Sequence, residues 1–179
     1  MKNILFLIML STSVIGFSQN KMITKSGKII FEASVPSFEE VKATNSNVTF
    51  VLNPATGEIA SLALMKGFRF KVALMEEHFN ENYIESDQYP KAVFKGKIDN
   101  FDVSSLTAVA KDFIIKGKLE LHGKSKDITT TARISTSATG ISIVSNFSVN
   151  ASDFNIAIPS LVKSKVSNKI NIQFAAVLK

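Results

Sequence analysis

The chain has 179 residues, with 21 lysines and arginines against 15 aspartates and glutamates, so its formal net charge is +6. It contains no cysteine, which excludes disulfide bonds, thiol catalysis and cysteine-ligated metals. The lysines are spread along the chain, which predicts a solvated exterior and no nucleic-acid partner; weak peripheral contact with an anionic membrane surface is compatible with this charge.

The first residues have the pattern of a secretory signal peptide. A short positive start precedes the apolar run 4–10, and the small residues Gly16 and Ser18 lie just before the expected cleavage point after Ser18. A membrane anchor is the alternative, but the run is shorter than the roughly 20 residues needed to cross a bilayer. We therefore predict a signal peptide at 1–18, one domain at 19–179, and an exported protein, periplasmic or secreted.

After the signal peptide, apolar and polar residues alternate in most of the chain, which predicts strands. The ranges with this pattern are 28–35, 44–53, 58–74, 91–101, 112–121, 127–136, 141–151, 154–158 and 168–179. Counting short neighbouring runs together, this is about eight strands joined mostly by hairpin-length turns. The fold class is all-β, and we expect an antiparallel up-and-down β-barrel, with a β-sandwich as the alternative.

The longest of these runs, 58–74, is expected to be one long strand with a single apolar face. Gly67 lies where a bend would relieve a strand of this length. Long, bent strands with one apolar face belong to sheets that close on themselves. The residues assigned to the inner face are Ala60, Leu62, Leu64, Phe68, Phe70, Val72 and Leu74.

The segment that follows is the one stretch of the domain with helical spacing. Met75, His78, Phe79 and Tyr83 recur on one face of a helix near 75–85, and its acidic residues fill the other, solvated face. The Tyr-Pro pair at 89–90 ends the helix, because a residue before proline is driven to extended geometry. We predict that this short helix covers one end of the barrel.

The inner faces are rich in phenylalanine, of which the chain has fourteen, and it has no tryptophan. Small residues such as Gly96, Gly117 and Ala92 share these faces and are expected to leave room for a long, thin apolar guest. The alternative is an interior filled by its own side chains. The residues predicted to line an apolar ligand cavity are Phe31, Phe50, Leu62, Leu64, Phe68, Phe70, Phe79, Phe94, Phe113, Ile115, Phe147, Phe154 and Phe174.

Residues for catalysis or metal binding are sparse. The two histidines, His78 and His122, lie in different kinds of segment, and a metal site would need Glu77, Glu81 or Asp127 to converge on them. The Gly-x-Ser-x-Gly and His-Glu-x-x-His patterns and a phosphate-binding glycine loop do not occur. We predict a protein without catalytic residues, metal or cofactor; an enzyme would require both histidines and a carboxylate to meet in one cleft.

Two stretches carry recognisable motifs. The segment 75–98 contains Glu77-His78-Phe79, Asp87-Gln88-Tyr89-Pro90 and Phe94-Lys95-Gly96. It resembles a segment of the YceI-like family that ends in Tyr-Pro followed by a phenylalanine-containing strand. The segment 117–126, Gly-Lys-Leu-Glu-Leu-His-Gly-Lys-Ser-Lys, looks like the family turn Gly-x-Leu-x-x-His-Gly-x-x-Lys. The final strands, with Asp153-Phe154-x-Ile156 and Ile170-x-Ile172, are also similar, and the likeness spans about residues 27–179.

The resemblance implies an exported or periplasmic barrel of lipocalin-like shape, and some family members hold polyisoprenoids or other long-chain lipids inside the barrel. The expected function is therefore an exported binding protein that carries or sequesters such a lipid without chemistry. The alternative is a packed barrel, not a carrier, with a stress-response or interaction role.

Overall fold

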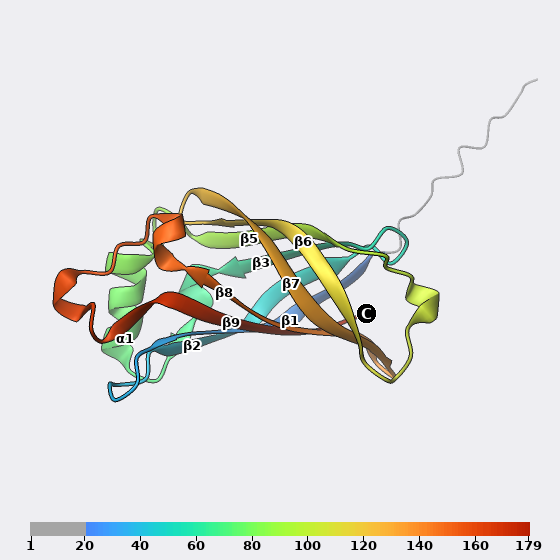
Figure 1. Cartoon of the computed structure of the whole chain (residues 1–179), viewed down its shortest axis with the longest axis horizontal. Coiled ribbons are helices and arrows are strands. Elements are labelled where there is room, and N and C mark those ends of the chain that lie inside the picture. Colours follow the sequence, from blue (N-terminus) through green and yellow to red (C-terminus); the bar gives the residue numbers. More distant parts are fainter. Residues whose placement is uncertain (1–20) are drawn as a thin grey trace, which may run out of the picture.

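The computed structural model describes residues 21–179, which form a closed antiparallel β-barrel (Figure 1). Its eight long strands are β1 (Met22–Ser34), β2 (Lys42–Leu52), β3 (Glu58–Leu64), β5 (Lys91–Ile98), β6 (Lys111–Leu121), β7 (Lys124–Ser137), β8 (Gly140–Asn150) and β9 (Val166–Leu178). A two-residue strand, β4 (Arg69–Phe70), pairs with the start of β2. The predicted signal peptide lies outside the described residues.

The barrel closes because β1 pairs with strands on both of its sides. Ile29 lies opposite Asn45 of β2 on one side and opposite Phe174 of β9 on the other. The remaining neighbours follow the chain, from β9 through β8, β7, β6 and β5 to β3 and β2. The predicted up-and-down barrel is therefore confirmed, and the β-sandwich alternative is wrong.

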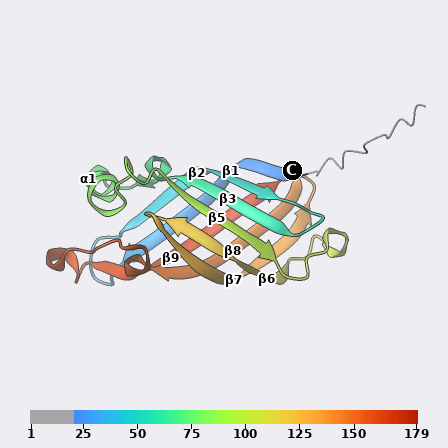
Figure 2. The ribbon, with the colours of Figure 1, turned by 90° about the horizontal axis from the view of Figure 1, so that it is seen from above.

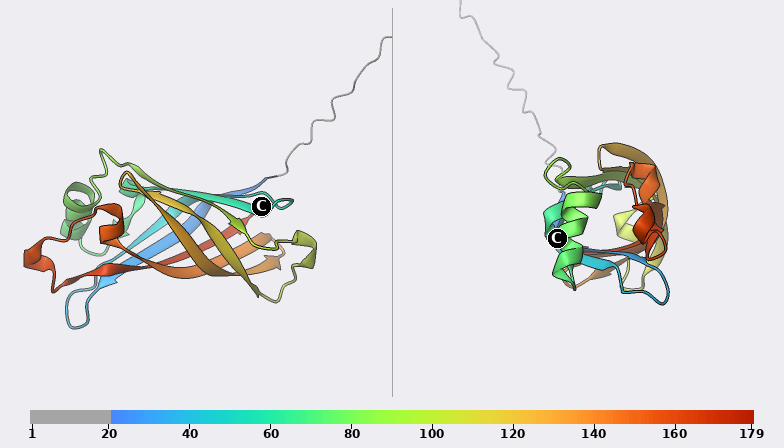
Figure 3. Two further views of the ribbon diagram at one scale, coloured as in Figure 1. Left: turned by 45° about the horizontal axis from the view of Figure 1, so that its top comes forward. Right: turned by 90° about the vertical axis from the view of Figure 1, so that its left-hand side faces the viewer.

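The two ends of the barrel differ. One end, here called the mouth end, carries helix α1 (Ala73–His78) and the π-helical turn η2 (Phe79–Tyr83) on one side. The β8–β9 connection, with the 3₁₀ turns η4 (Ala151–Phe154) and η5 (Ser160–Val162), lies on the other side of the same end (Figures 2 and 3). The predicted short helix is confirmed. Among residues 21–179, no helix combines the length and the apolar character that a membrane crossing requires.

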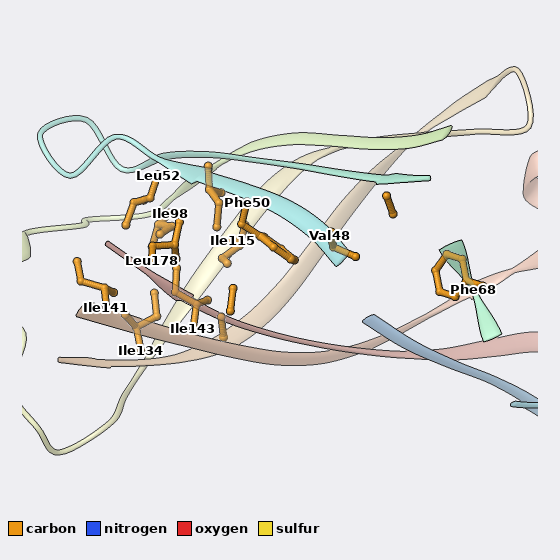
Figure 4. Packing of buried hydrophobic residues seen from close by; sticks show 14 of the residues in the cluster. Val48, Phe50, Leu52, Phe68, Ile98, Ile115, Ile134, Ile141, Ile143 and Leu178 are labelled. Atoms are coloured by element: carbon orange, nitrogen blue, oxygen red, sulfur yellow. The ribbon is translucent and has the colours of Figure 1, made fainter. Parts of the chain in front are cut away.

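The opposite end, here called the packed end, is filled by aliphatic side chains. Leu52, Ile98, Ile134, Ile143 and Leu178 are completely buried and come from five different strands. Figure 4 shows these side chains gathered together. The 3₁₀ turn η3 (Val103–Ser105) and the C-terminus lie at this end (Figure 1).

The run 58–74 is not the single strand that its alternation predicts. β3 ends at Leu64, and the 3₁₀ turn η1 (Met65–Gly67) separates it from β4. The buried Asn45 side chain donates a hydrogen bond to the Leu64 carbonyl at 3.0 Å, and its Nδ2 would lie 2.6 Å from a Cβ atom at Gly67. The turn therefore fits closely around Asn45, and glycine leaves the space that this contact needs.

The turn also shifts the alternation by one residue, which makes part of the predicted inner face wrong. Before the turn, the buried residues Ile59 and Ala63 face inward, so Leu62 and Leu64 face outward, with 37% and 55% of their surface exposed. After the turn, Phe68 is buried as predicted.

The strand expected at 154–158 does not form either. Asn155 adopts a left-handed backbone conformation with φ of 58°, which interrupts extended geometry, and η4 ends there. The preceding strand, β8, stops at Asn150.

A candidate apolar binding cavity

A cavity of about 510 Å³ occupies the mouth end of the barrel. All eight long strands contribute to its wall, and almost all of the lining side chains are apolar. This volume lies within the range of about 300–1,000 Å³ that is typical of sites for small ligands. Such a wall can bind an apolar chain and offers few hydrogen-bond partners to a polar one.

Three segments surround the opening of the cavity. The β1–β2 connection contributes Phe38 and Glu39, the helical segment contributes His78, and the β8–β9 connection contributes Val162 and Lys165. The glutamate, the histidine and the lysine are all exposed. Charged or titratable side chains among the lining are therefore confined to the mouth, and the interior beyond them is apolar except for a few hydroxyl groups.

Helix α1 and turn η2 are held over the barrel by a cluster of phenylalanine rings. The ring centroid of Phe79 lies 5.3 Å from that of Phe31, 6.1 Å from that of Phe68 and 5.2 Å from that of Phe70. Tilted and edge-to-face pairs at these distances contribute about 0.5–1.5 kcal/mol each beyond their burial. The cluster fixes the helical segment, which was predicted to cover one end of the barrel, to the barrel wall.

One acidic residue of the helix has a structural role that the sequence analysis missed. The Glu76 carboxylate accepts hydrogen bonds from Arg69 Nη1 at 2.8 Å and from the Phe70 backbone amide at 3.1 Å. It is half-buried, whereas Glu77 and Glu81 are exposed, as the helix pattern predicts. Glu76 thus joins α1 to β4.

The turn between β6 and β7 ties the other segments of the mouth end together through His122. Its Nδ1 lies 2.9 Å from the Phe154 carbonyl oxygen and its Nε2 lies 2.9 Å from Glu85 Oε2. The ring also packs on Tyr89, with centroids 4.3 Å apart. We call this set of contacts the His122 clamp.

The sequence carries no signal for this role of His122, because its partners are 32 and 37 residues away in the chain. The two histidines do not form one site: His78 lies at the mouth, whereas His122 is used by the clamp. Over the described range, no group of three histidine, aspartate or glutamate side chains is arranged to hold a metal ion.

Most of the residues predicted to line a cavity do so. The structure brings together around it Phe31, Phe50, Phe68, Phe70, Phe79, Phe94, Ile115, Phe147, Phe154 and Phe174. Leu62 and Leu64 face outward, and Phe113 is not part of the lining but packs against Phe101 with centroids 6.0 Å apart. Contact of the lining residues with a ligand stays a prediction.

The glycines of the wall do not leave room for a guest, contrary to expectation. Gly96 of β5 and Gly117 of β6 lie opposite each other, and Cβ atoms at these positions would lie 2.8 and 2.5 Å from Cζ of Phe94. The tip of the Phe94 ring therefore lies over both glycines and uses their space. Ala63 and Ala92, which are paired across β3 and β5, do line the cavity.

The sequence analysis also missed aliphatic lining residues. Ile128, Ile170 and Ile172 line the cavity and have the inward alternation that the sequence shows, but the predicted set consists mainly of phenylalanines and leaves them out. Ile59 and Ala63 were missed for another reason, because turn η1 reverses the alternation in β3.

Comparison with known proteins agrees with this architecture. A family model described as a YceI-like domain matches residues 8–178. None of the functionally curated proteins matches the chain.

Three solved structures illustrate the similarity. A polyisoprenoid binding domain from Saccharophagus degradans, implicated in plant cell wall breakdown, aligns with a TM-score of 0.75 at 17% identity over 89% of this chain and 97% of its own. BcnA of Burkholderia cenocepacia aligns with a TM-score of 0.67 at 15% identity, covering 83% and 94% of the two chains. A YceI protein of Campylobacter jejuni gives 0.60 at 21% identity, covering 81% and 89%. At these identities the structural matches show the fold.

Proposed function

Because the chain belongs to the YceI-like family, we propose that it holds a long-chain apolar ligand, a polyisoprenoid or another lipid, in its barrel without chemistry. The observation that carries this proposal is the cavity of about 510 Å³, which is apolar inside and has its charged side chains at one opening. The polyisoprenoid binding domain among the structural neighbours supports the same class of ligand.

The apolar wall explains why a long chain is required. Burial of each methylene group contributes about 0.8 kcal/mol. Association itself costs an estimated 4–15 kcal/mol in lost freedom of motion. A ligand of a few carbons cannot offset this cost in a cavity with few polar partners, whereas a chain of about 20 carbons offsets even the upper estimate.

The alternative of a simply packed barrel fits only half of the molecule. Aliphatic side chains fill the packed end, but the mouth end is hollow. A stress-response or interaction protein has no need for an apolar hollow of this size, so the mouth end favours the carrier.

We further propose that the protein acts after export, in a periplasm or outside the cell, and exchanges its ligand with a membrane. The β8–β9 connection exposes 88% of Leu161, and the β1–β2 connection exposes 47% of Phe38. Lys163 and Lys165 follow Leu161. Exposed apolar side chains beside lysines suit peripheral contact with an anionic lipid surface.

Native mass spectrometry of protein purified from its own cell envelope tests the proposal. A co-purifying lipid is expected, and uptake of isoprenoid probes is expected from the delipidated protein. A protein that is free of lipid and also takes up no probe would overturn the proposal.

Matched variants connect the result to the cavity. Phe70→Asp and Phe94→Asp bring a charge into the apolar lining and should abolish binding or folding, because a buried, unpaired carboxylate is very costly. Leu64→Asp in β3 is the control, since this side chain faces solvent, and it should bind as the wild type does. Normal lipid binding by both phenylalanine variants would place the ligand elsewhere.

A further inference from the structure

We propose that the ligand enters and leaves through the side of the barrel, between β7 and β8, and that turn η4 is the gate of this side entrance. This inference rests on the proposed function and adds a route to it. Three features of the structure carry it: the incomplete pairing of β7 with β8, the position of η4 in the resulting gap, and the side-chain contacts that hold η4 there.

Strands β7 and β8 are paired along only part of their length. Their ladder joins 132–137 of β7 to 140–145 of β8 and includes no residue nearer the mouth end. Segment 124–131 of β7 is still paired with β6, and segment 146–150 of β8 is still paired with β9. The barrel wall is therefore split between these two segments, and Figure 1 shows the two strands diverging towards the mouth end.

Two hydroxyl groups end the ladder at the point where the strands part. Ser145 Oγ donates to the Thr131 carbonyl at 2.7 Å and lies 2.8 Å from Thr130 Oγ1. Both hydroxyl-bearing residues, Thr130 and Ser145, are buried. Because these side chains satisfy one another and the carbonyl beside them, the split has a defined end.

Turn η4 fills the gap between the two strands. It contacts β7, β8 and β9, and in Figure 1 it lies, in orange, between the diverging ends of β7 and β8. Ala151 and Phe154 of this turn are buried and line the cavity, whereas Ser152 and Asp153 between them are exposed. One face of η4 is thus part of the cavity wall, and the other face is in contact with solvent.

Side-chain contacts, and not a ladder, hold η4 in this position. The Phe154 carbonyl oxygen lies 2.9 Å from His122 Nδ1 of the clamp. On the other side, the Ser152 amide donates to Asn168 Oδ1 of β9 at 3.0 Å, and Asn168 Nδ2 donates to Ser152 Oγ at 3.2 Å. Displacing η4 breaks these contacts, whereas parting β6 from β7 or β8 from β9 breaks a ladder that runs along almost the whole of both strands.

The same connection carries residues suited to membrane contact. Turn η5, which follows η4 in the β8–β9 connection, contains Leu161, and 88% of the surface of this residue is exposed. If Phe154 leaves the wall while the connection lies in a lipid surface, its ring stays in apolar surroundings. Its displacement therefore costs less free energy there than in water, and contact with a membrane favours the open gate.

Stopped-flow fluorescence with a dansyl-labelled fatty acid tests the gate. Uptake is measured with delipidated protein, and release is measured after mixing the complex with vesicles of phosphatidylcholine and phosphatidylglycerol. Asn168→Ala removes both bonds to Ser152 at a position outside the cavity lining, so uptake and release should both become about twofold to tenfold faster at unchanged equilibrium affinity. Asn171→Ala, at an exposed position of the same strand, is the matched control and should exchange at the wild-type rates.

Glu76→Ala distinguishes the side entrance from a passage beneath helix α1. It removes the bonds from Arg69 and from the Phe70 amide that join α1 to β4, and Glu76 does not line the cavity. Exchange should be accelerated less by Glu76→Ala than by Asn168→Ala. An equal or larger acceleration by Glu76→Ala would overturn the side entrance.

A reversible cross-link provides the opposite test, because it closes the gate in the folded protein. The chain has no cysteine, and Ser152 and Asn168 are in side-chain contact, so Ser152→Cys combined with Asn168→Cys places a single pair of thiols across this contact. Exchange should be about tenfold or more slower in the oxidised form than in the reduced form. Equal rates in the two forms, with the cross-link confirmed by mass spectrometry, would overturn the gate and leave the proposed function intact. Failure of the wild-type protein to take up the probe would reject both.

Discussion

The packed end and the mouth end are built from the same strands with the same alternation, yet one is solid and the other hollow. On β7, Ile134 is completely buried among aliphatic neighbours, whereas Ile128, six residues earlier on the same face, lines the cavity. Alternation therefore determines which side chains point inward, but the shapes and partners of those side chains determine whether they meet across the barrel.

The mouth end is hollow although its side chains are the larger ones. Its rings pack against one another and against the strands: Phe31, Phe68 and Phe70 pack against Phe79 of turn η2, and the tip of Phe94 lies over two glycines. The branched aliphatic residues of the packed end instead gather into one group without exposed surface. Residue volume alone would have predicted the opposite arrangement.

The largest expected difference comes from the same substitution at both ends of β7. Ile134→Ala should lower the free energy of unfolding by about 2–5 kcal/mol, because it leaves a void in close-packed surroundings. Ile128→Ala should cost less than half as much, because its side chain already borders empty space on one side. Urea denaturation of the two variants measures both values, and equal costs would contradict a hollow mouth end.

The next largest effect is expected at the glycines beneath Phe94. Gly117→Ala should cost about 1–3 kcal/mol, because its Cβ would lie 2.5 Å from both the Lys95 carbonyl oxygen and Phe94 Cζ. Urea denaturation gives the cost. The displaced ring should also reduce the amount of bound fluorescent probe.

A double variant separates the two contacts of Gly117. In a Phe94→Leu background the ring is absent, so Gly117→Ala meets only the backbone contact. The loss of unfolding free energy caused by Gly117→Ala should therefore be smaller in this background than in the wild type. An equal loss in both backgrounds would mean that the Phe94 ring does not use the space beside Gly117.

The His122 clamp allows the mouth end to be loosened without touching the packed end. His122→Ala removes the hydrogen bonds to Phe154 and Glu85 and leaves the buried carbonyl without its partner, which should cost about 1–3 kcal/mol. Amide hydrogen exchange should become faster in 84–89 and 151–156, and stay unchanged in the strand segments of the packed end.

Glu85→Gln is the milder comparison. It keeps a hydrogen-bond acceptor opposite His122 Nε2 and removes only the charge of a half-exposed carboxylate, so we expect a loss of about 0.2–1 kcal/mol. Faster exchange throughout the barrel in His122→Ala would show that the clamp supports the whole fold and is not specific to the mouth end.

The sequence predicted the barrel and the helix well, because both depend on periodicity within one segment. It failed in β3, where Asn45 from another strand holds the turn at Met65–Gly67 and reverses the alternation for Leu62 and Leu64. The volume of the cavity depends on how rings from distant strands lie against one another, and single-strand periodicity carries no information about that.

The smallest effect is expected in the loop at the packed end, and it depends on pH. Hydrogen bonds from the Ser104 hydroxyl, at 2.7 Å, and from its amide, at 2.9 Å, lower the pKa of the Asp102 carboxyl. Because the folded-state pKa is the lower one, the stabilisation is present above the unfolded-state pKa and is lost as pH falls through the folded-state pKa. Ser104→Ala removes the hydroxyl bond and keeps the amide bond, so an NMR titration of Asp102 should give a higher pKa than in the wild type. Identical titration curves would mean that the Ser104 hydroxyl does not lower the pKa of Asp102. The NMR signals of the aliphatic side chains at the packed end should not change with pH in either protein.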